Sequence, residues 1–204
     1  LFALAYRVKQ AGVGAKVYFR GLVEYSNICR KDCFYCGIRR GNAAVHRYEM
    51  TDEEVLAAAD WAWKNRYGSL VIQAGERQDR RFVDTIGRLV AEIKRRSGNR
   101  LGITLSLGEQ SEETFRRWFA AGAHRYLLRI ETSNPALYAR LHPGDHSWQV
   151  RRDCLDTLIR IGYQAGTGVM IGLPHQTLAD LADDILFFRA LDVGMIGMGP
   201  YLKH

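Results

Sequence analysis

Residues 17–29 read VYFRGLVEYSNIC, and they distinguish between the two folds that the rest of the chain allows. Residues 17–25 alternate and are rich in β-branched and aromatic side chains, which predicts a strand. A dinucleotide-binding fold would place a GxGxxG turn directly after this strand, whereas this chain continues with Ser26, Asn27, Ile28 and Cys29. The sequence therefore favours a barrel of parallel strands over an open doubly wound sheet.

Five further strand-like segments alternate with helix-like segments along the chain. We expect the strands at residues 69–73, 103–106, 125–131, 164–171 and 195–198. We expect the helices at about 51–65, 79–96, 111–121, 135–141, 148–161 and 177–191. Six such units with short connections predict an α/β fold, a partial (βα)6 TIM-type barrel of parallel strands with outer helices, because a standard barrel needs eight strands.

The chain has 204 residues, of which 47% are hydrophobic and 25% charged, enough to build one sizeable core. We predict a single domain over residues 1–204, with a helical extension at 1–16, the barrel from about residue 17, and a truncated C-terminus. No apolar run approaches the roughly 18–20 residues of a membrane-spanning helix. Residues 1–16 also lack the features of a signal peptide, so we expect a cytoplasmic protein with no membrane partner.

The net charge is +7, and the basic residues recur in pairs spread along the chain. Spread pairs of this kind predict solvated helix faces. Phosphate binding needs positive charge, but no recognition module or aromatic-basic repeat accompanies it here. Nucleic acid is therefore not an expected partner.

Three of the four cysteines form the pattern CxxxCxxC in the loop that leaves the first predicted strand: Cys29, Cys33 and Cys36. Active sites of barrels lie at this end of the strands. Three thiolates on a short loop can hold three irons of a 4Fe–4S cluster and leave the fourth iron open. The fourth cysteine, Cys154, lies in an apolar helical stretch and is expected in the core.

Two other interpretations of the cysteines remain open. A structural zinc ion could take the three cysteines with His46 as fourth ligand, which would make the chain a zinc-stabilised basic binding module. Alternatively, Cys33 and Cys36 could form a thioredoxin-like redox pair, although this leaves Cys29 without a role.

The cysteine pattern, with the aromatic residue Tyr35 before its last cysteine and a position after the first barrel strand, resembles the radical S-adenosylmethionine (SAM) superfamily. The resemblance implies two cofactors, a 4Fe–4S cluster and SAM, with the amine and carboxylate of SAM on the open iron. It also implies that an electron from the cluster cleaves the sulfonium and releases a 5′-deoxyadenosyl radical. The expected electron donor is a ferredoxin or a flavodoxin.

Further segments resemble the FeFe-hydrogenase maturase branch of that superfamily, among them residues 24–29, 36–40, 73–76, 106–109, 125–132 and 170–174. This resemblance implies a role in assembling the hydrogenase H-cluster. The implied partners are a small-molecule or organometallic substrate and other hydrogenase maturation proteins. The alternative within the superfamily is an enzyme similar to methylornithine synthase or biotin synthase.

The same resemblance implies residue roles. SAM contacts are implied for Tyr35, for Gly75 through its backbone, for Ser106, for Glu131 at the ribose, for Arg151 at the carboxylate, and for Gly172 near the adenine. The substrate cavity is implied for Arg125, Arg129 and Met195. No role is assigned to His142 or His146.

Strand periodicity supports part of this assignment independently. Along residues 125–131, Arg125, Arg129 and Glu131 share one face with Leu127. Burying two arginines and a glutamate against apolar helices would cost free energy. This face is therefore expected to point into a polar barrel interior.

Overall fold

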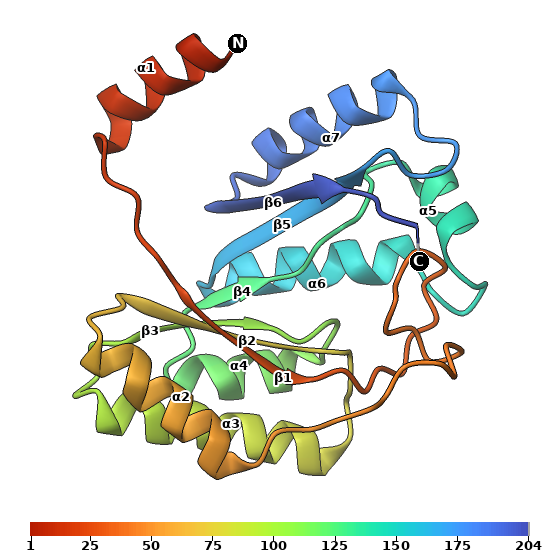
Figure 1. Ribbon diagram of the computed structural model, residues 1–204. Helices are drawn as coiled ribbons and strands as arrows, with labels where there is room; N and C mark the ends of the chain where they lie inside the picture. The colour runs from red at the N-terminus through yellow and green to blue at the C-terminus, as the bar shows by residue number, and fades with distance from the viewer. Residues whose placement is uncertain (204) are drawn as a thin grey trace.

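The computed structural model describes residues 1–203. Within them, six strands form one sheet in the order β1-β2-β3-β4-β5-β6, and each strand is parallel to its neighbours. Figure 1 shows the sheet curving, with the strands ending on the right-hand side. The sequential order confirms the α/β fold and the partial (βα)6 barrel. The strands are β1 Gly21–Ser26, β2 Ser69–Ala74, β3 Gly102–Ser106, β4 Arg125–Leu127, β5 Gln164–Ile171 and β6 Met195–Pro200.

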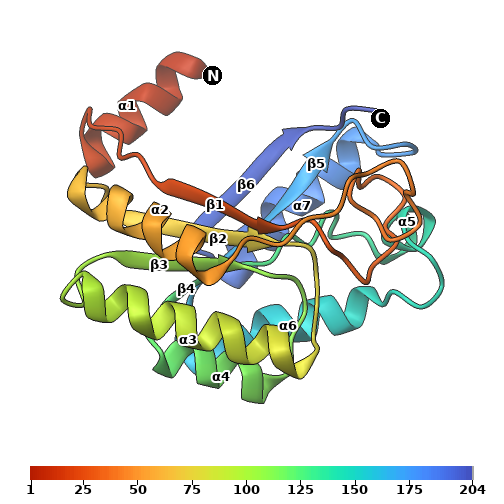
Figure 2. The ribbon, with the colours of Figure 1, turned by 60° about the horizontal axis from the view of Figure 1, so that its bottom comes forward.

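Most of the helices lie on the outer side of the curved sheet (Figures 1 and 2). The helices of the described residues are α1 Phe2–Val13, α2 Asp52–Lys64, α3 Arg80–Arg96, α4 Glu112–Ala120, α5 Pro135–Leu141, α6 Trp148–Ile161 and α7 Leu178–Leu191. From α2 onward, each begins after a residue whose side chain accepts a backbone N–H of the first turn: Thr51, Asp79, Ser111, Asn134, Ser147 and Thr177. These caps explain why the predicted helix starts agree with the observed ones to within a residue.

The hydrophobic core lies between the outer face of the sheet and the helices. In β1, Val23 and Tyr25 are buried while Leu22 and Glu24 are exposed, because successive side chains point to opposite faces. Core side chains pack from β2, β3, β4, α3, α4 and α6, and they include Leu70, Ile72, Ile103, Leu105, Tyr126, Phe82, Ile86, Phe115, Trp118, Leu155 and Leu158. Cys154 belongs to the same core, as predicted.

Two predicted strands are shorter than expected. The first begins at Gly21 rather than residue 17, because Gly21 is the first residue paired with β2, and Tyr18 and Phe19 are exposed. The fourth ends at Leu127 rather than residue 131. Beyond Leu127 the chain remains bonded to β5: the N–H of Leu128 donates to the Gly166 carbonyl oxygen (2.9 Å), and Glu131 forms a bridge with Val169.

The predicted alternation survives this shortening. Tyr126, Leu128 and Ile130 are buried at 0%, 2% and 0% exposure in the core behind the sheet. Arg129 and Glu131 lie on the other face and reach a cavity at the strand ends. The sequence pattern therefore identified the inward face correctly, although regular strand pairing stops earlier.

Helix α1 stands away from the barrel in Figure 1, and none of its residues is buried. It lies within residues 1–16, where the sequence predicts a helical extension. No helix within residues 1–203 is both long and apolar enough to cross a membrane.

Candidate active site

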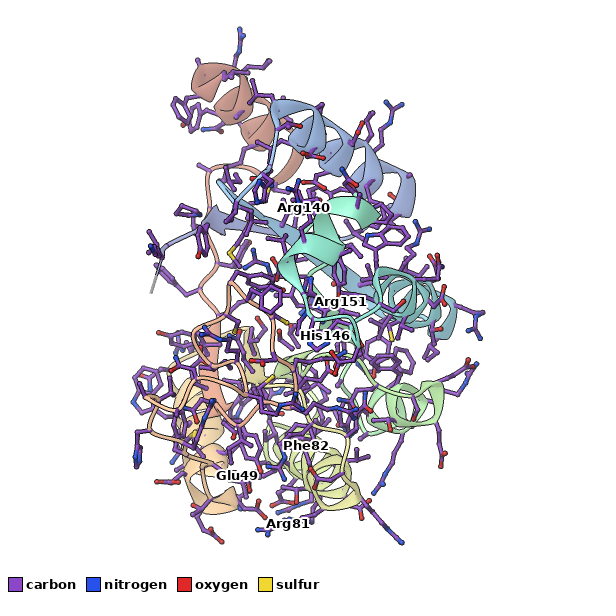
Figure 3. All side chains as sticks on the ribbon, turned by 90° about the vertical axis from the view of Figure 1, so that its right-hand side faces the viewer. Glu49, Arg81, Phe82, Arg140, His146 and Arg151 are labelled. Atoms are coloured by element: carbon purple, nitrogen blue, oxygen red, sulfur yellow. The ribbon has the colours of Figure 1, made fainter. Side chains whose placement is uncertain are left out.

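A cavity of about 360 Å³ opens where the strands end. Figure 1 shows the loop after β1 on this side of the sheet, next to α5. In Figure 3, which faces this side, Arg151 lies near the centre of the view. The cavity brings together nine residues that the sequence predicted for one site: Cys29, Cys33, Cys36, Tyr35, Gly75, Ser106, Arg129, Glu131 and Arg151.

Close backbone packing fixes the start of the cysteine loop, residues 29–36, against the end of β2. A Cβ atom on Gly75 would lie 2.4 Å from the Ile28 carbonyl oxygen and 2.7 Å from the Cys29 Cβ. Only glycine permits this approach. The backbone N–H groups of Lys31 and Glu76 then donate to the Cys29 sulfur at 3.4 and 3.3 Å.

The thiols themselves are partly or fully buried, and none forms a disulfide within the described residues. Burial raises the pKa of the Cys33 thiol to about 12, while Arg151 and the Tyr35 hydroxyl act in the opposite direction. Burial also raises the pKa of Cys36. Iron binds thiolates, so metal uptake at this loop must release protons.

The arrangement suits a cluster better than a single zinc ion. Within residues 1–203, no three His, Cys, Asp or Glu side chains are gathered closely enough to hold one metal ion. His46, the fourth ligand of the zinc interpretation, does not line the cavity. The three thiols share one cavity, and each can bind a different iron of a 4Fe–4S cluster.

Arg129 and Glu131 present unsatisfied polar atoms at the cavity. Arg129 Nη2 lies 3.3 Å from Glu131 Oε2, yet both atoms and Arg129 Nε lack a hydrogen-bond partner among the described residues. Burial raises the pKa of Glu131, whereas Arg129 and Arg151 oppose the rise. Glu131 also has a positive φ of 68°, which is strained for a non-glycine residue. Buried polar groups normally find partners, so these atoms fit a polar ligand in the cavity.

Arg151 is held by buried carboxylates. Its Nε donates to Glu109 Oε1 at 2.9 Å, its Nη1 donates to the Arg129 carbonyl oxygen at 2.9 Å, and its Nη2 lies 3.8 Å from Glu76 Oε2. Lys31 joins the same group, with its Nζ 2.8 Å from Glu109 Oε2 and 3.6 Å from Glu76 Oε1. Two cations and two carboxylates thus form one buried network beneath the cysteine loop.

The sequence interpretation missed most of this network. Lys31 lies inside CxxxCxxC and Glu76 directly follows Gly75, so their positions could have suggested a site role. Glu109 follows Ser106 by three residues, which is compatible with a place in the cavity wall or before a helix. The two glutamates differ in titration: burial raises the pKa of Glu76, while Arg151 and Lys31 outweigh burial and lower the pKa of Glu109.

Three residues expected at the site do not line the cavity. Arg125 is the first residue of β4, and its Nε donates to Gln164 Oε1 (2.6 Å) at the start of β5, so it lies at the opposite end of the strands. Met195 begins β6 and contacts Arg20 (Sδ to Nη1, 3.0 Å). The β6 residues that line the cavity are further along the strand and include Met198.

Gly172 is the third of these residues. It follows β5 with φ 87°, and its N–H donates to Gln176 Oε1 at 2.7 Å. It is not among the residues lining the cavity. The positive φ favours glycine at this turn.

The family model described as the Radical SAM superfamily matches residues 23–188. The chain therefore belongs to the radical SAM superfamily, and it is an enzyme of the radical SAM type. Members of this family bind a 4Fe–4S cluster and SAM, as the cysteine pattern predicted.

Among curated proteins, the chain is 45% identical over 205 residues to the FeFe hydrogenase maturase subunit HydE of Thermotoga maritima, covering 100% of this chain and 57% of that protein. It is 31% identical over 199 residues to the biotin synthase of Geobacillus kaustophilus, covering 94% of this chain and 57% of that enzyme. The chain thus spans just over half the length of these relatives.

Two solved structures share the fold. Methylornithine synthase (PylB) superposes with a TM-score of 0.89 at 22% identity, over 98% of this chain and 58% of that one. The FeFe-hydrogenase maturase HydG superposes with a TM-score of 0.81 at 22% identity, over 99% and 47%. At this identity the similarity concerns the fold alone.

Proposed function

We propose that this chain binds a 4Fe–4S cluster through Cys29, Cys33 and Cys36, binds SAM beside it, and acts in assembly of the FeFe-hydrogenase H-cluster. The observation that carries the proposal is the convergence of the three cysteines of CxxxCxxC on one polar cavity in a member of the radical SAM superfamily. When bound, the cluster supplies the electron that cleaves SAM to a 5′-deoxyadenosyl radical.

The chain's own residues would bind the cluster and SAM and orient SAM in the cavity. Gly75 lets the backbone of β2 come close to the cysteine loop, and Ser106 offers a hydroxyl at the end of β3. Glu131 can accept hydrogen bonds from a ribose, and Arg129 stands beside it with free donors. Arg151 is available to a carboxylate only through the part of its guanidinium that Glu109 and the Arg129 carbonyl oxygen leave unbound. Tyr35 lines the same cavity.

The maturation role is supported by the 45% identity to HydE over the whole chain. We propose a small-molecule or organometallic substrate, a ferredoxin or flavodoxin as reductant, other maturation proteins as partners, and action in the cytoplasm. The biotin synthase relative, at 31% identity, supports the alternative of a biotin-synthase-like or methylornithine-synthase-like reaction.

Anaerobic reconstitution with iron and sulfide tests the cofactor part. We expect a brown protein that makes 5′-deoxyadenosine from SAM and dithionite. Cys33→Ala should lose the visible absorption and the product, because one iron loses its ligand. Cys154→Ala is the matched control, since Cys154 is a core residue outside the cavity, and it should keep both. A colourless wild-type protein that holds zinc would contradict the proposal.

A chimera tests the substrate part. The matching segment of Thermotoga maritima HydE would be replaced by this chain, and hydrogenase maturation would be measured in a host lacking its own HydE. Restored hydrogenase activity is expected. An equivalent chimera with biotin synthase tests the biotin-synthase-like alternative. That alternative would be favoured if this chimera restored biotin formation while the HydE chimera failed to restore hydrogenase maturation.

A further inference from the structure

The end of α5 and the segment between α5 and α6 contact the cysteine loop at three points. The backbone N–H of Phe34 donates to the Leu141 carbonyl oxygen at 3.0 Å. The N–H of Asp32 lies 3.1 Å from His146 Nε2, and the Tyr35 hydroxyl lies 3.0 Å from His142 Nε2. Figure 1 shows α5 next to this loop, and Figure 3 places His146 close to the centre of the same side.

The partners of His146 determine its tautomer. A backbone N–H can only donate, so the Nε2 facing Asp32 must be an unprotonated acceptor. The ring proton then lies on Nδ1, where it donates to Asp145 Oδ1 at 2.7 Å. A doubly protonated ring would place two donors face to face. His146 is 8% exposed, so water does not readily replace this bond.

The hydrogen-bond partners of His142 also indicate a ring that is protonated on Nδ1. Its Nδ1 lies 2.8 Å from the Tyr138 carbonyl oxygen, which can only accept, so Nδ1 carries the proton. Its Nε2 is then the acceptor of the Tyr35 hydroxyl proton. The ring is 3% exposed and stacks on Tyr138 with ring centroids 3.7 Å apart. Burial lowers the pKa of His142 to about 4, which agrees with a neutral ring.

We propose that His142 and His146 are positioning residues that hold the cysteine loop in its folded conformation before any metal binds. His146 fixes the backbone just before Cys33, and His142 fixes the Tyr35 ring just before Cys36. These contacts with the cysteine loop need no cofactor. Only their purpose, which is to keep the thiols directed at one cavity, rests on the proposed function.

The ring nitrogens of the metal-free chain give the first test. In ¹⁵N-histidine-labelled protein near neutral pH, the shifts of His142 and His146 should both report a neutral ring protonated on Nδ1. His124, which is exposed, serves as the reference ring. An Nε2-protonated or charged His146 would overturn the proposal, because such a ring cannot accept from Asp32.

Amide hydrogen exchange of the same metal-free chain gives the second test. The Asp32 and Phe34 amides should be protected, and an unprotected Asp32 in the wild-type chain would overturn the proposal. In His146→Leu, Asp32 exchange should rise about tenfold, the factor expected for one ordinary hydrogen bond. His146→Gln should restore protection by offering an oxygen acceptor, and His124→Leu should leave it unchanged. The amide of Val83 in α3, bonded to Asp79 at 3.0 Å, monitors the global fold.

Iron retention separates this proposal from the proposed function. After reconstitution, His146→Leu should lose iron to a chelator several-fold faster than the wild type, and His146→Gln should slow that loss. Equal loss from wild type and His146→Leu would overturn the positioning role while leaving the cluster assignment intact. A wild-type chain that takes up no iron would instead refute the cluster assignment, and the tautomers and amide exchange would still decide whether the histidines hold the loop.

Discussion

Gly75 determines how closely the cysteine loop can approach the end of β2. An added Cβ would lie 2.4 Å from the Ile28 carbonyl oxygen, and backbone cannot move aside as a flexible side chain can. We expect Gly75→Ala to displace the loop that carries Cys29, to lower iron uptake, and to cost about 1–3 kcal/mol of unfolding free energy. Iron analysis and denaturant unfolding measure the two effects.

Gly68→Ala is the matched control, because an added Cβ at Gly68 meets no atom within 4 Å. It should keep its iron and differ little in stability. Equal iron content in Gly75→Ala and wild type would mean that the loop does not need this close approach.

Arg151 has a structural role that the sequence did not reveal. Its side chain is 9% exposed and faces Glu76 and Glu109, whose side chains are 4% and 5% exposed. Arg151→Ala would leave two buried carboxylates with Lys31 as their remaining cation. We expect a loss of about 3–5 kcal/mol in the unfolding free energy of the metal-free chain, together with weaker SAM binding in the reconstituted one.

The neighbouring Arg152 supplies the control, since its side chain is 30% exposed and pairs with Asp156 on the helix surface. Arg152→Ala should change stability by less than about 1 kcal/mol. If Arg151→Ala proved as stable as Arg152→Ala, the buried network would not be the structural element described above.

At the scale of elements, α1 and α6 differ in what they bury. No residue of α1 is buried, so removal of residues 1–13 should change the unfolding free energy by less than about 0.5 kcal/mol and leave iron uptake unchanged. In α6, Leu155 is 0% exposed, and Leu155→Ala should cost about 2–5 kcal/mol. Thermal unfolding of the two variants measures the contrast. A large loss of stability on removing α1 would show that the helix packs on the barrel in solution.

The elements also show where sequence patterns are reliable. Helix starts were predicted to within a residue because each depends on a side chain and a backbone N–H a few positions apart, as with Thr51 and Glu54. The start of β1 and the end of β4 differ from the predicted ones by four residues each, because a strand exists only where a partner strand lies opposite. Period-two burial still identified the inward face of residues 125–131, since it depends only on backbone extension.

For the whole molecule, cofactor binding and folding should be linked. The cavity draws on the cysteine loop, β2, β3, β4, β6 and α6, so a cluster bound there stabilises the folded chain and not the unfolded one. We expect the reconstituted chain to unfold at a higher temperature than the metal-free chain. Cys33→Ala should show no such increase after the same treatment. An identical midpoint for wild type with and without iron would contradict this linkage.

Sequence patterns alone predicted the class of protein, the order of strands and helices, and nine of the residues that line the cavity, including the three cysteines. These features follow from spacing within a few residues and from the periodicity of single elements. Only the tertiary structure decided that Arg125 and Met195 lie at the far end of the strands, and that Gly172 serves a turn.

Only the tertiary structure, likewise, joined Lys31 to Glu109 across 78 residues, Tyr35 to His142 across 107, and Asp32 to His146 across 114. A buried ion pair or hydrogen bond of this kind depends on which loops the curved sheet brings together at the ends of its strands. No local pattern in a single sequence records that proximity.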